Sequence, residues 1–182
     1  MNRRQLLKSL GISGALLLVA SPALALKLSR HKKNDTRERL IPLTDKERCP
    51  VCGMFVKPFP KWITQIQFSN GSHHSFDGMK CLCRFYFNPE KYSTIVTRQD
   101  FQLILVRDYY TLHFIEHKQA YYVIGSDVFG PMGHELIPFV DSKAAKTFQI
   151  DHHGQKILRF DEITNDLLDL LDRSKKQINL DE

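Results

Sequence analysis

Two thiols and a thioether lie within six residues in the segment Cys49-Pro50-Val51-Cys52-Gly53-Met54. Thiolate and thioether sulfurs are soft donors, and together they suit Cu(I) better than magnesium, calcium or manganese. Gly53 gives the backbone access to dihedral angles that other residues avoid, so the sulfurs of Cys52 and Met54 can turn toward one point. The segment therefore predicts a short loop in which Cys49, Cys52 and Met54 offer two or three sulfurs to one ion.

A second loop, Gly130-Pro131-Met132-Gly133-His134, places an imidazole two residues after a thioether. Thioether and imidazole are again compatible with Cu(I). Taken alone, Met132 could instead fill a gap in the core, and His134 could be a surface residue. Opposite the cysteine loop, however, Met132 and His134 become candidate ligands for the same copper ion, so we predict one site built from both loops.

Cys81 and Cys83 complete the set of four cysteines. Asp77 is predicted to be the N-cap of a helix that contains both and ends at Asn88-Pro89. At about 100° per residue, Cys81 and Cys83 lie roughly 200° apart around this helix, so they cannot easily bind the same ion. We expect Cys83 to be a small core residue and Cys81 to lie on the solvent side.

Two other chemistries stay open for the cysteines. Cys49 and Cys52 could be the redox pair of a thiol–disulfide oxidoreductase, although Gly53 is a poor start for the helix that would lower a thiol pKa. All four cysteines could instead hold a structural zinc ion, although the predicted helix separates Cys81 from Cys83. Metal analysis of protein purified without oxygen separates these alternatives, since it would find copper, no metal or stoichiometric zinc.

Residues 1–25 are predicted to be an export signal. The basic start Arg3-Arg4 resembles the twin-arginine pattern, and the small residues Ala23-Leu24-Ala25 suit a cleavage site. The apolar run between them, Leu10 to Ala20, is shorter than the roughly 20 residues of a membrane-spanning helix. We therefore expect a periplasmic protein that uses the twin-arginine route, with an uncleaved membrane anchor as the alternative. An oxidising periplasm favours paired cysteines, so free thiols there need protection, which a bound metal would give.

Charge and motif content exclude other classes of function. Removal of residues 1–25 takes away three basic residues and no acid, so 26 Lys and Arg fall to 23 against 20 acidic residues, a net charge of +3. This excess is too small to indicate a nucleic-acid partner. No Ser/His/Asp order, phosphate loop or dinucleotide fingerprint is present, so we expect no enzyme. The histidine pairs at 73–74 and 152–153 are expected on the surface, because neighbours on a strand face opposite ways.

The predicted fold class is α+β, with two small strand–strand–helix units packed together and a C-terminal amphipathic helix. Hydrophobic periodicity and turn signals place the elements. The expected strands are 62–68, 73–76, 101–106, 111–115, 121–124 and 135–139, and the expected later helices are 142–150 and 161–173. The expected segments are a signal peptide at 1–25, a polar linker at 26–47, a first unit at 48–100, a second unit at 101–173 and a polar tail at 174–182.

These motifs, in this order, resemble the NosL family of nitrous oxide reductase accessory proteins. The resemblance covers roughly residues 48–154 and is carried by Cys49–Met54, Phe76-Asp77-Gly78, Tyr122–Asp127 and Gly130–Phe139. It implies a periplasmic chaperone that holds one Cu(I) for nitrous oxide reductase or its assembly machinery.

By position, the resemblance places copper ligands at Cys49, Cys52, Met54 and Met132, with His134 nearby. Two features depart from the usual pattern of the family. Members are commonly lipoproteins, whereas this leader contains no cysteine that could accept a lipid. The Cys81-Leu82-Cys83 segment is an addition to the pattern, so a further thiol role is open.

Overall fold

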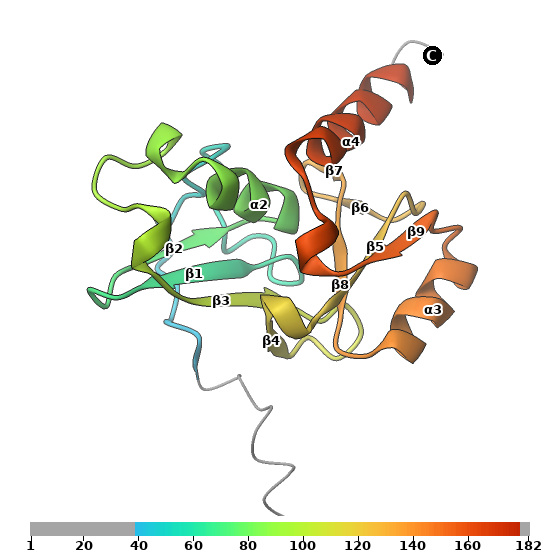
Figure 1. Cartoon of the computed structure of the whole chain (residues 1–182), viewed down its shortest axis with the longest axis horizontal. Coiled ribbons are helices and arrows are strands. Elements are labelled where there is room, and N and C mark those ends of the chain that lie inside the picture. The colour runs from blue at the N-terminus through green and yellow to red at the C-terminus, as the bar shows by residue number, and fades with distance from the viewer. Residues whose placement is uncertain (1–38, 179–182) are drawn as a thin grey trace, which may run out of the picture. The chain divides into compact units, whose positions relative to one another are not determined.

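Figure 1 shows the computed structural model of the chain, which describes residues 39–178. The expected signal peptide at 1–25 and most of the expected linker lie outside these residues, so both stay predictions. None of the described helices has the length and apolar composition that crossing a bilayer requires. The described residues form a mixed α+β structure with three helices and several small antiparallel sheets, which confirms the α+β part of the predicted fold class.

The first half of this structure is built on a four-stranded antiparallel sheet. In chain order its strands are β1 (Thr64–Phe68), β2 (His73–Phe76), β3 (Phe101–Arg107) and β4 (Phe114–Glu116), and in space they are ordered β2-β1-β3-β4. The predicted hairpin joins β1 to β2, with Gly71 at a φ of +83° and the Asn70 side chain accepting hydrogen bonds from Ser72. Central β1 is buried along almost its whole length, which gives the cysteine-bearing segments a rigid support.

The second half contains a smaller antiparallel sheet and a short hairpin. The sheet has the order β8-β5-β9, and the hairpin pairs β6 with β7. Their bounds are β5 (Tyr121–Ile124), β6 (Phe129–Gly130), β7 (Gly133–His134), β8 (Ile137–Phe139) and β9 (Lys156–Leu158). Helix α3 (Ser142–Asp151) packs on this sheet, and Asp141 caps it as predicted by accepting a hydrogen bond from the Ala144 N–H.

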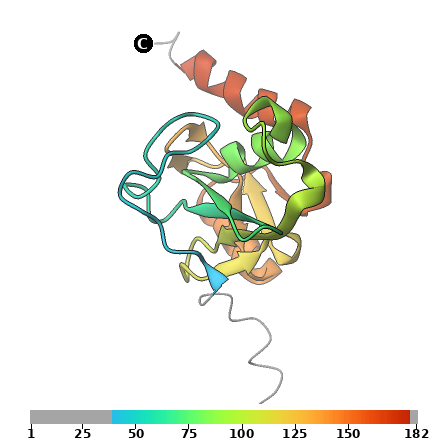
Figure 2. The same ribbon diagram turned by 90° about the vertical axis from the view of Figure 1, so that its left-hand side faces the viewer.

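Two other helices pack beside the sheets. Helix α2 (Met79–Phe87) contacts β1 and β2, and helix α4 (Asn165–Ile178) contacts both α2 and the β7 strand (Figure 1). Helix α4 begins four residues later than predicted, because 160–162 form a separate 3-10 turn, and it continues into the expected polar tail. The segment that carries the first two cysteines, residues 39–62, loops along one side of the molecule (Figure 2, blue to teal).

Helix α2 begins differently from the prediction. Its N-cap is Gly78, not Asp77, and Gly78 has no side chain that could accept a hydrogen bond from the helix. The first turn of a helix leaves N–H groups without partners. Here Glu135, from the segment after β7, supplies the acceptor, because its Oε2 lies 2.8 Å from the Lys80 backbone N. A methyl group at position 78 would lie 2.6 Å from Glu135 Oε1, so the cap requires glycine there.

Burial of Glu135 makes the stability of the fold depend on pH. Burial raises the pKa of Glu135 to about 8 from its ordinary 4.5, and the nearby Asp77 adds to this, while Lys80 opposes it. Between pH 4.5 and about pH 8, Glu135 keeps its proton in the folded chain but has lost it in the unfolded chain. The free energy of unfolding should therefore fall as the pH rises through this range.

We predict that the melting temperature of the metal-free protein falls by several degrees between pH 5 and pH 9, and that Glu135→Gln removes most of this fall. The glutamine has no proton to lose, and it can still accept the hydrogen bond from Lys80. Thermal melts at a series of pH values measure the effect, with the exposed Glu90→Gln as a control that keeps the slope. If the melting temperature of Glu135→Gln fell with pH as steeply as that of the parent, Glu135 would not be the source of the pH dependence.

Candidate metal centre

Three cysteines and one aspartate bring potential metal ligands to one point. The sulfurs of Cys49, Cys52 and Cys81 and a carboxylate oxygen of Asp77 all lie within 4.8 Å of one another. No other group of three or more cysteine, histidine or acidic side chains comes together in this way within the described part of the chain. Cys49 and Cys52 are two of the ligands that the sequence predicts. Asp77 and Cys81 are additions, since the sequence predicts other roles for them.

The loop from Cys49 to Met54 is closed by its own backbone. The Cys49 N–H donates to the Met54 carbonyl at 2.8 Å, and the Gly53 N–H donates to the Cys49 carbonyl at 2.9 Å. Gly53 has a φ of +77°, the left-handed conformation that glycine adopts without strain, as the sequence predicted. Arg48 further ties the loop by donating to the Gly53 carbonyl at 2.8 Å. The loop therefore holds its two thiols on a small, internally bonded frame.

The junction between β2 and α2 supplies the other two side chains. Asp77 follows the last residue of β2, and Cys81 lies in the first turn of α2, four residues later. The Cys52 thiol donates to Asp77 Oδ1 at 3.2 Å, which links the loop to the junction. Asp77 is fully buried and its Oδ2 has no hydrogen-bond partner, so one carboxylate oxygen at the cluster stays unpaired.

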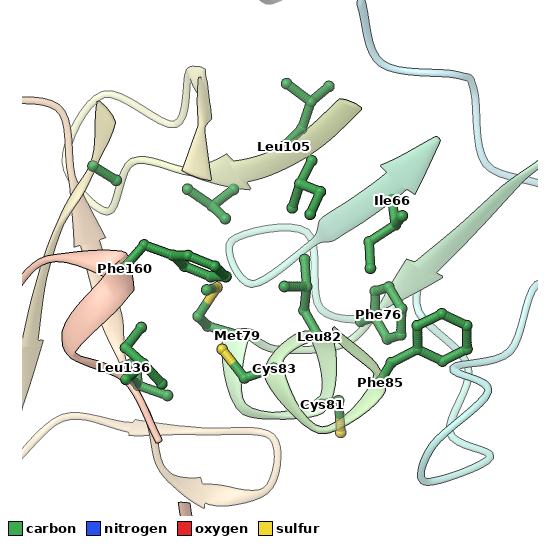
Figure 3. Close-up of a cluster of buried hydrophobic side chains, with 14 of the residues drawn as sticks. Ile66, Phe76, Met79, Cys81, Leu82, Cys83, Phe85, Leu105, Leu136 and Phe160 are labelled. Atoms are coloured by element: carbon green, nitrogen blue, oxygen red, sulfur yellow. The ribbon is translucent and has the colours of Figure 1, made fainter. Parts of the chain in front are cut away.

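The prediction for Cys81, one of the two cysteines in helix α2, is wrong. We expected it on the solvent side of α2, but only 5% of it is exposed, because it faces the Cys49 loop. Cys83 is fully buried, as predicted, and its sulfur points away from that of Cys81, toward the apolar core that includes Leu136 (Figure 3). The predicted separation of the two thiols therefore holds, and only Cys81 belongs to the cluster.

Hydrogen bonding and burial set the acidities of the clustered thiols. The Cys81 thiol donates to the Cys49 sulfur, which lowers the pKa of Cys49 and raises the pKa of Cys81. Burial is the main cause that raises the pKa of Cys52 to about 12. Without a metal, the cluster thus keeps most of its protons. Metal ions bind cysteine as thiolate, so an ion entering the site would displace those protons.

The predicted thioether ligands lie at two openings beside the cluster. Met132 lines a pocket of about 330 Å³ together with Cys52 and Cys81. Met54 lines another pocket, of about 390 Å³, together with Cys52 and the aromatic side chains of Phe55 and Phe59. Cys52 borders both pockets, and it is the only half-exposed thiol, since Cys49, Cys81 and Cys83 are buried. Each predicted loop therefore borders a pocket that Cys52 also lines, and a single site built from both loops stays a prediction.

The histidines among residues 39–178 lie outside the clustered atoms. His134 is half-buried on β7, with its ring 4.7 Å from the ring of Phe129, so its part in metal binding stays a prediction. His73 pairs with Glu47 at 3.1 Å. The ring of His74 packs 5.2 Å from those of both Phe68 and Phe85, so His74 borders the core rather than lying on the surface as expected.

Sequence reasoning missed Asp77 and Cys81 as members of the site, although a partial signal was present. Asp77 directly follows β2 and Cys81 lies in the first turn of α2, so both belong to one strand–helix junction. The preference of aspartate for helix caps, and the comparison of Cys81 with Cys83 alone, hide this pair. An aspartate and a cysteine at one predicted junction, read together with the Cys-x-x-Cys loop, were the available signal.

Comparison with known proteins identifies the family of this chain. Residues 40–168, more than two thirds of the chain, match the model of the NosL family. The chain belongs to the NosL family. This confirms the resemblance found in the sequence.

Individual NosL proteins show the same relationship. The chain is 28% identical over 143 residues to a protein of Stutzerimonas stutzeri named "Copper-binding lipoprotein NosL", and the match covers 75% of this chain and 73% of that protein. The crystal structure of the copper chaperone NosL from Shewanella denitrificans superimposes with a TM-score of 0.60 at 26% identity, over 69% of this chain and 96% of that one. The fold around the cluster is therefore similar to that of a solved NosL protein.

The environments of the four thiols predict the order in which they are alkylated. In the reduced, metal-free, folded protein, iodoacetamide should label Cys52 first, because Cys49, Cys81 and Cys83 are buried. The raised pKa of Cys52 should make even this reaction slow near pH 8, since the thiolate is the nucleophile. Mass spectrometry of peptides taken at successive times measures the order, and labelling in denaturant is the control. Labelling of Cys81 before Cys52 would contradict the structure.

Proposed function

We propose that this NosL protein is a periplasmic, non-enzymatic chaperone that binds one Cu(I) through sulfur and supplies copper for the maturation of nitrous oxide reductase. Its relatives are named a copper-binding lipoprotein and a copper chaperone, which supports a role in copper handling. The observation that carries the proposal is the convergence of three thiols, flanked by two thioether side chains. Soft sulfur donors of this kind favour Cu(I) over magnesium, calcium or manganese.

The ligands we propose divide into a buried group and an exchangeable group. Cys49 and Cys81 are buried and linked by a hydrogen bond, so they are suited to hold the ion. Cys52 lies at the surface of the cluster, beside Met132 on one side and Met54 on the other. Thioethers bind without losing a proton, so they can bind and release the ion easily, whereas thiols bind as thiolates. Copper can then leave by ligand exchange through Cys52.

Asp77 is proposed to orient Cys52 rather than to bind copper. Carboxylate oxygens suit harder cations better than Cu(I), and the observed contact of Asp77 is the hydrogen bond it accepts from the Cys52 thiol. His134 remains a further candidate ligand on the same hairpin as Met132.

Zinc is the strongest competitor, because Asp77 joins the three cysteines. Three thiolates and one carboxylate could complete a tetrahedral zinc site, which differs from the four-cysteine site considered from the sequence. Cys83, the fourth cysteine of that earlier hypothesis, lies outside the cluster. Family membership decides in favour of copper as the biological cargo.

The geometry also argues against a thiol–disulfide oxidoreductase. Such an enzyme needs an accessible thiol with a lowered pKa. Here the thiol with a lowered pKa is Cys49, of which only 1% is exposed. The accessible thiol, Cys52, has a raised pKa and is a poor nucleophile at neutral pH. The two required properties belong to different residues.

Location and partner follow from the sequence and the family. We propose export by the twin-arginine route, followed by transfer of copper to nitrous oxide reductase or to its assembly machinery. The relative from Stutzerimonas stutzeri is named a lipoprotein. The predicted cleavage point of this chain has no cysteine nearby, so lipid attachment there is not part of this proposal.

The test of the ligand set compares two cysteines of the same helix. The reduced protein should bind one Cu(I), and Cys81→Ala should weaken the affinity by at least about tenfold, the range typical of a disturbed metal site. Cys83→Ala is the matched control, because it is also buried on α2 but lies outside the cluster. Competition titration against a Cu(I) chelator measures both. Equal losses in the two variants, or tightly bound zinc that Cu(I) cannot displace, would overturn the proposal.

A further inference from the structure

The hairpin that carries Met132 is short and has little pairing of its own. Strands β6 and β7 pair only Phe129 with His134 and Gly130 with Gly133, which leaves Pro131 and Met132 as a two-residue turn. Gly133, directly after this turn, has a φ of +88°, a conformation that glycine adopts without strain. Isolated two-stranded hairpins are marginally stable at best in water. Contacts from outside the hairpin must therefore fix the position of Met132.

Lys80 provides the contact at the tip. Its Nζ donates to the Met132 carbonyl at 2.9 Å and lies 2.7 Å from Asp172 Oδ1 on α4. Only 4% of the Lys80 side chain is exposed, which is unusual for lysine. A buried ammonium group is stable only when it is paired and hydrogen-bonded. Its two partners therefore fix the ammonium group between α4 and the tip of the hairpin.

Lys80 also holds the chain just beyond the hairpin. Its backbone N–H donates to the buried Glu135 carboxylate, and Glu135 directly follows β7. The side chain of Glu135 fills the space that a side chain at Gly130 or Gly78 would need. One residue of α2 thus contacts the hairpin region at Met132 through its side chain and at Glu135 through its backbone. That residue immediately precedes Cys81.

We propose that Lys80 is a positioning residue that holds the Met132 thioether at the copper site. The proposal rests on the proposed function, which makes Met132 a copper ligand. Lys80, Met132, Cys52 and Cys81 all line the same pocket, so holding the Met132 backbone there keeps its sulfur within reach of the thiols. Lys80 touches no predicted ligand atom itself. Its effect on copper must therefore pass through Met132.

The test is a double-mutant cycle between Lys80→Leu and Met132→Leu. Removing one partner of an ion pair is costly when the other charge stays buried, but half of the Asp172 side chain is exposed and Arg84 still pairs with it at 2.8 Å. Met132→Leu keeps volume and removes the sulfur. Each single variant should weaken Cu(I) affinity by about 10-fold or more. The double variant should be no weaker than Met132→Leu alone, because coupled residues are non-additive.

Arg84→Leu is the matched control. Arg84 lies one turn further along α2, lines the same pocket and pairs with Asp172, but it has no hydrogen bond to the hairpin. Its replacement should leave Cu(I) affinity within about threefold of the parent, as expected for a group outside the ligand support. A competition titration against a Cu(I) chelator gives all the affinities, and melting curves of the metal-free variants confirm that each is folded.

The possible results distinguish a failure of the positioning role of Lys80 from a failure of the proposed copper ligands. If Lys80→Leu has no effect on affinity, or weakens it equally in the parent and in the Met132→Leu variant, the positioning role is overturned. If Met132→Leu alone has no effect, the proposed ligand set fails instead. A second readout then judges Lys80 separately: the carbon-13 methyl NMR signal of Met132 in the metal-free protein should shift in Lys80→Leu and not in Arg84→Leu. An unshifted signal overturns the proposal.

Discussion

The beginning of helix α2 is the constraint on which the rest of the structure depends. The first turn of this helix needs hydrogen-bond acceptors, and the buried carboxylate of Glu135 supplies one from the other half of the chain. Because Glu135 performs the cap, Asp77 is free to accept a hydrogen bond from Cys52 instead. The same arrangement requires glycine at position 78, where any side chain would meet the Glu135 carboxylate. The hydrogen bond that caps α2 and the hydrogen bond that links Asp77 to the cluster thus form at the same junction between β2 and α2.

The burial of the clustered thiols bears on the proposed periplasmic location. An oxidising compartment favours disulfides, yet three thiols lie together here with only Cys52 half-exposed. The hydrogen bond between Cys49 and Cys81 and the burial of both keep them from solvent. Under the proposed function, a chaperone that releases its ion needs one accessible ligand, and Cys52 is the thiol that has that position. On this proposal, protection and transfer depend on different residues of one cluster.

Local pattern was sufficient to predict much of the fold. Strands β1, β2, β3 and β5, the Asn-Gly hairpin and the Asp141 cap all follow from hydrophobic period and turn chemistry, which act over a few residues. The strand expected at 111–115 is mostly a turn, because the Asp108 carboxylate accepts hydrogen bonds from Tyr110 and Thr111, and β4 starts only at Phe114. Strand β9 was not predicted, since its three residues are too short to show a period.

The site was only partly predictable for a related reason. Cys49, Cys52 and Met54 are adjacent in sequence, so their spacing alone indicates soft-metal chemistry. The roles of Asp77 and Cys81 depend on partners 25 or more residues away, namely Cys52, Cys49 and Glu135. Helical periodicity correctly separated Cys81 from Cys83, but it could not tell that a loop covers the Cys81 face. Family resemblance supplied the copper function, and the structure added the third thiol.

The central claim, that three cysteine thiolates hold the ion, is tested most directly by X-ray absorption at the copper edge. Protein loaded with one Cu(I) per chain would be measured alongside its Cys81→Ala and Cys83→Ala variants. The account predicts a sulfur-dominated coordination shell that loses one short copper–sulfur bond in Cys81→Ala and is unchanged in Cys83→Ala. A shell that is the same in the parent and in Cys81→Ala would contradict it.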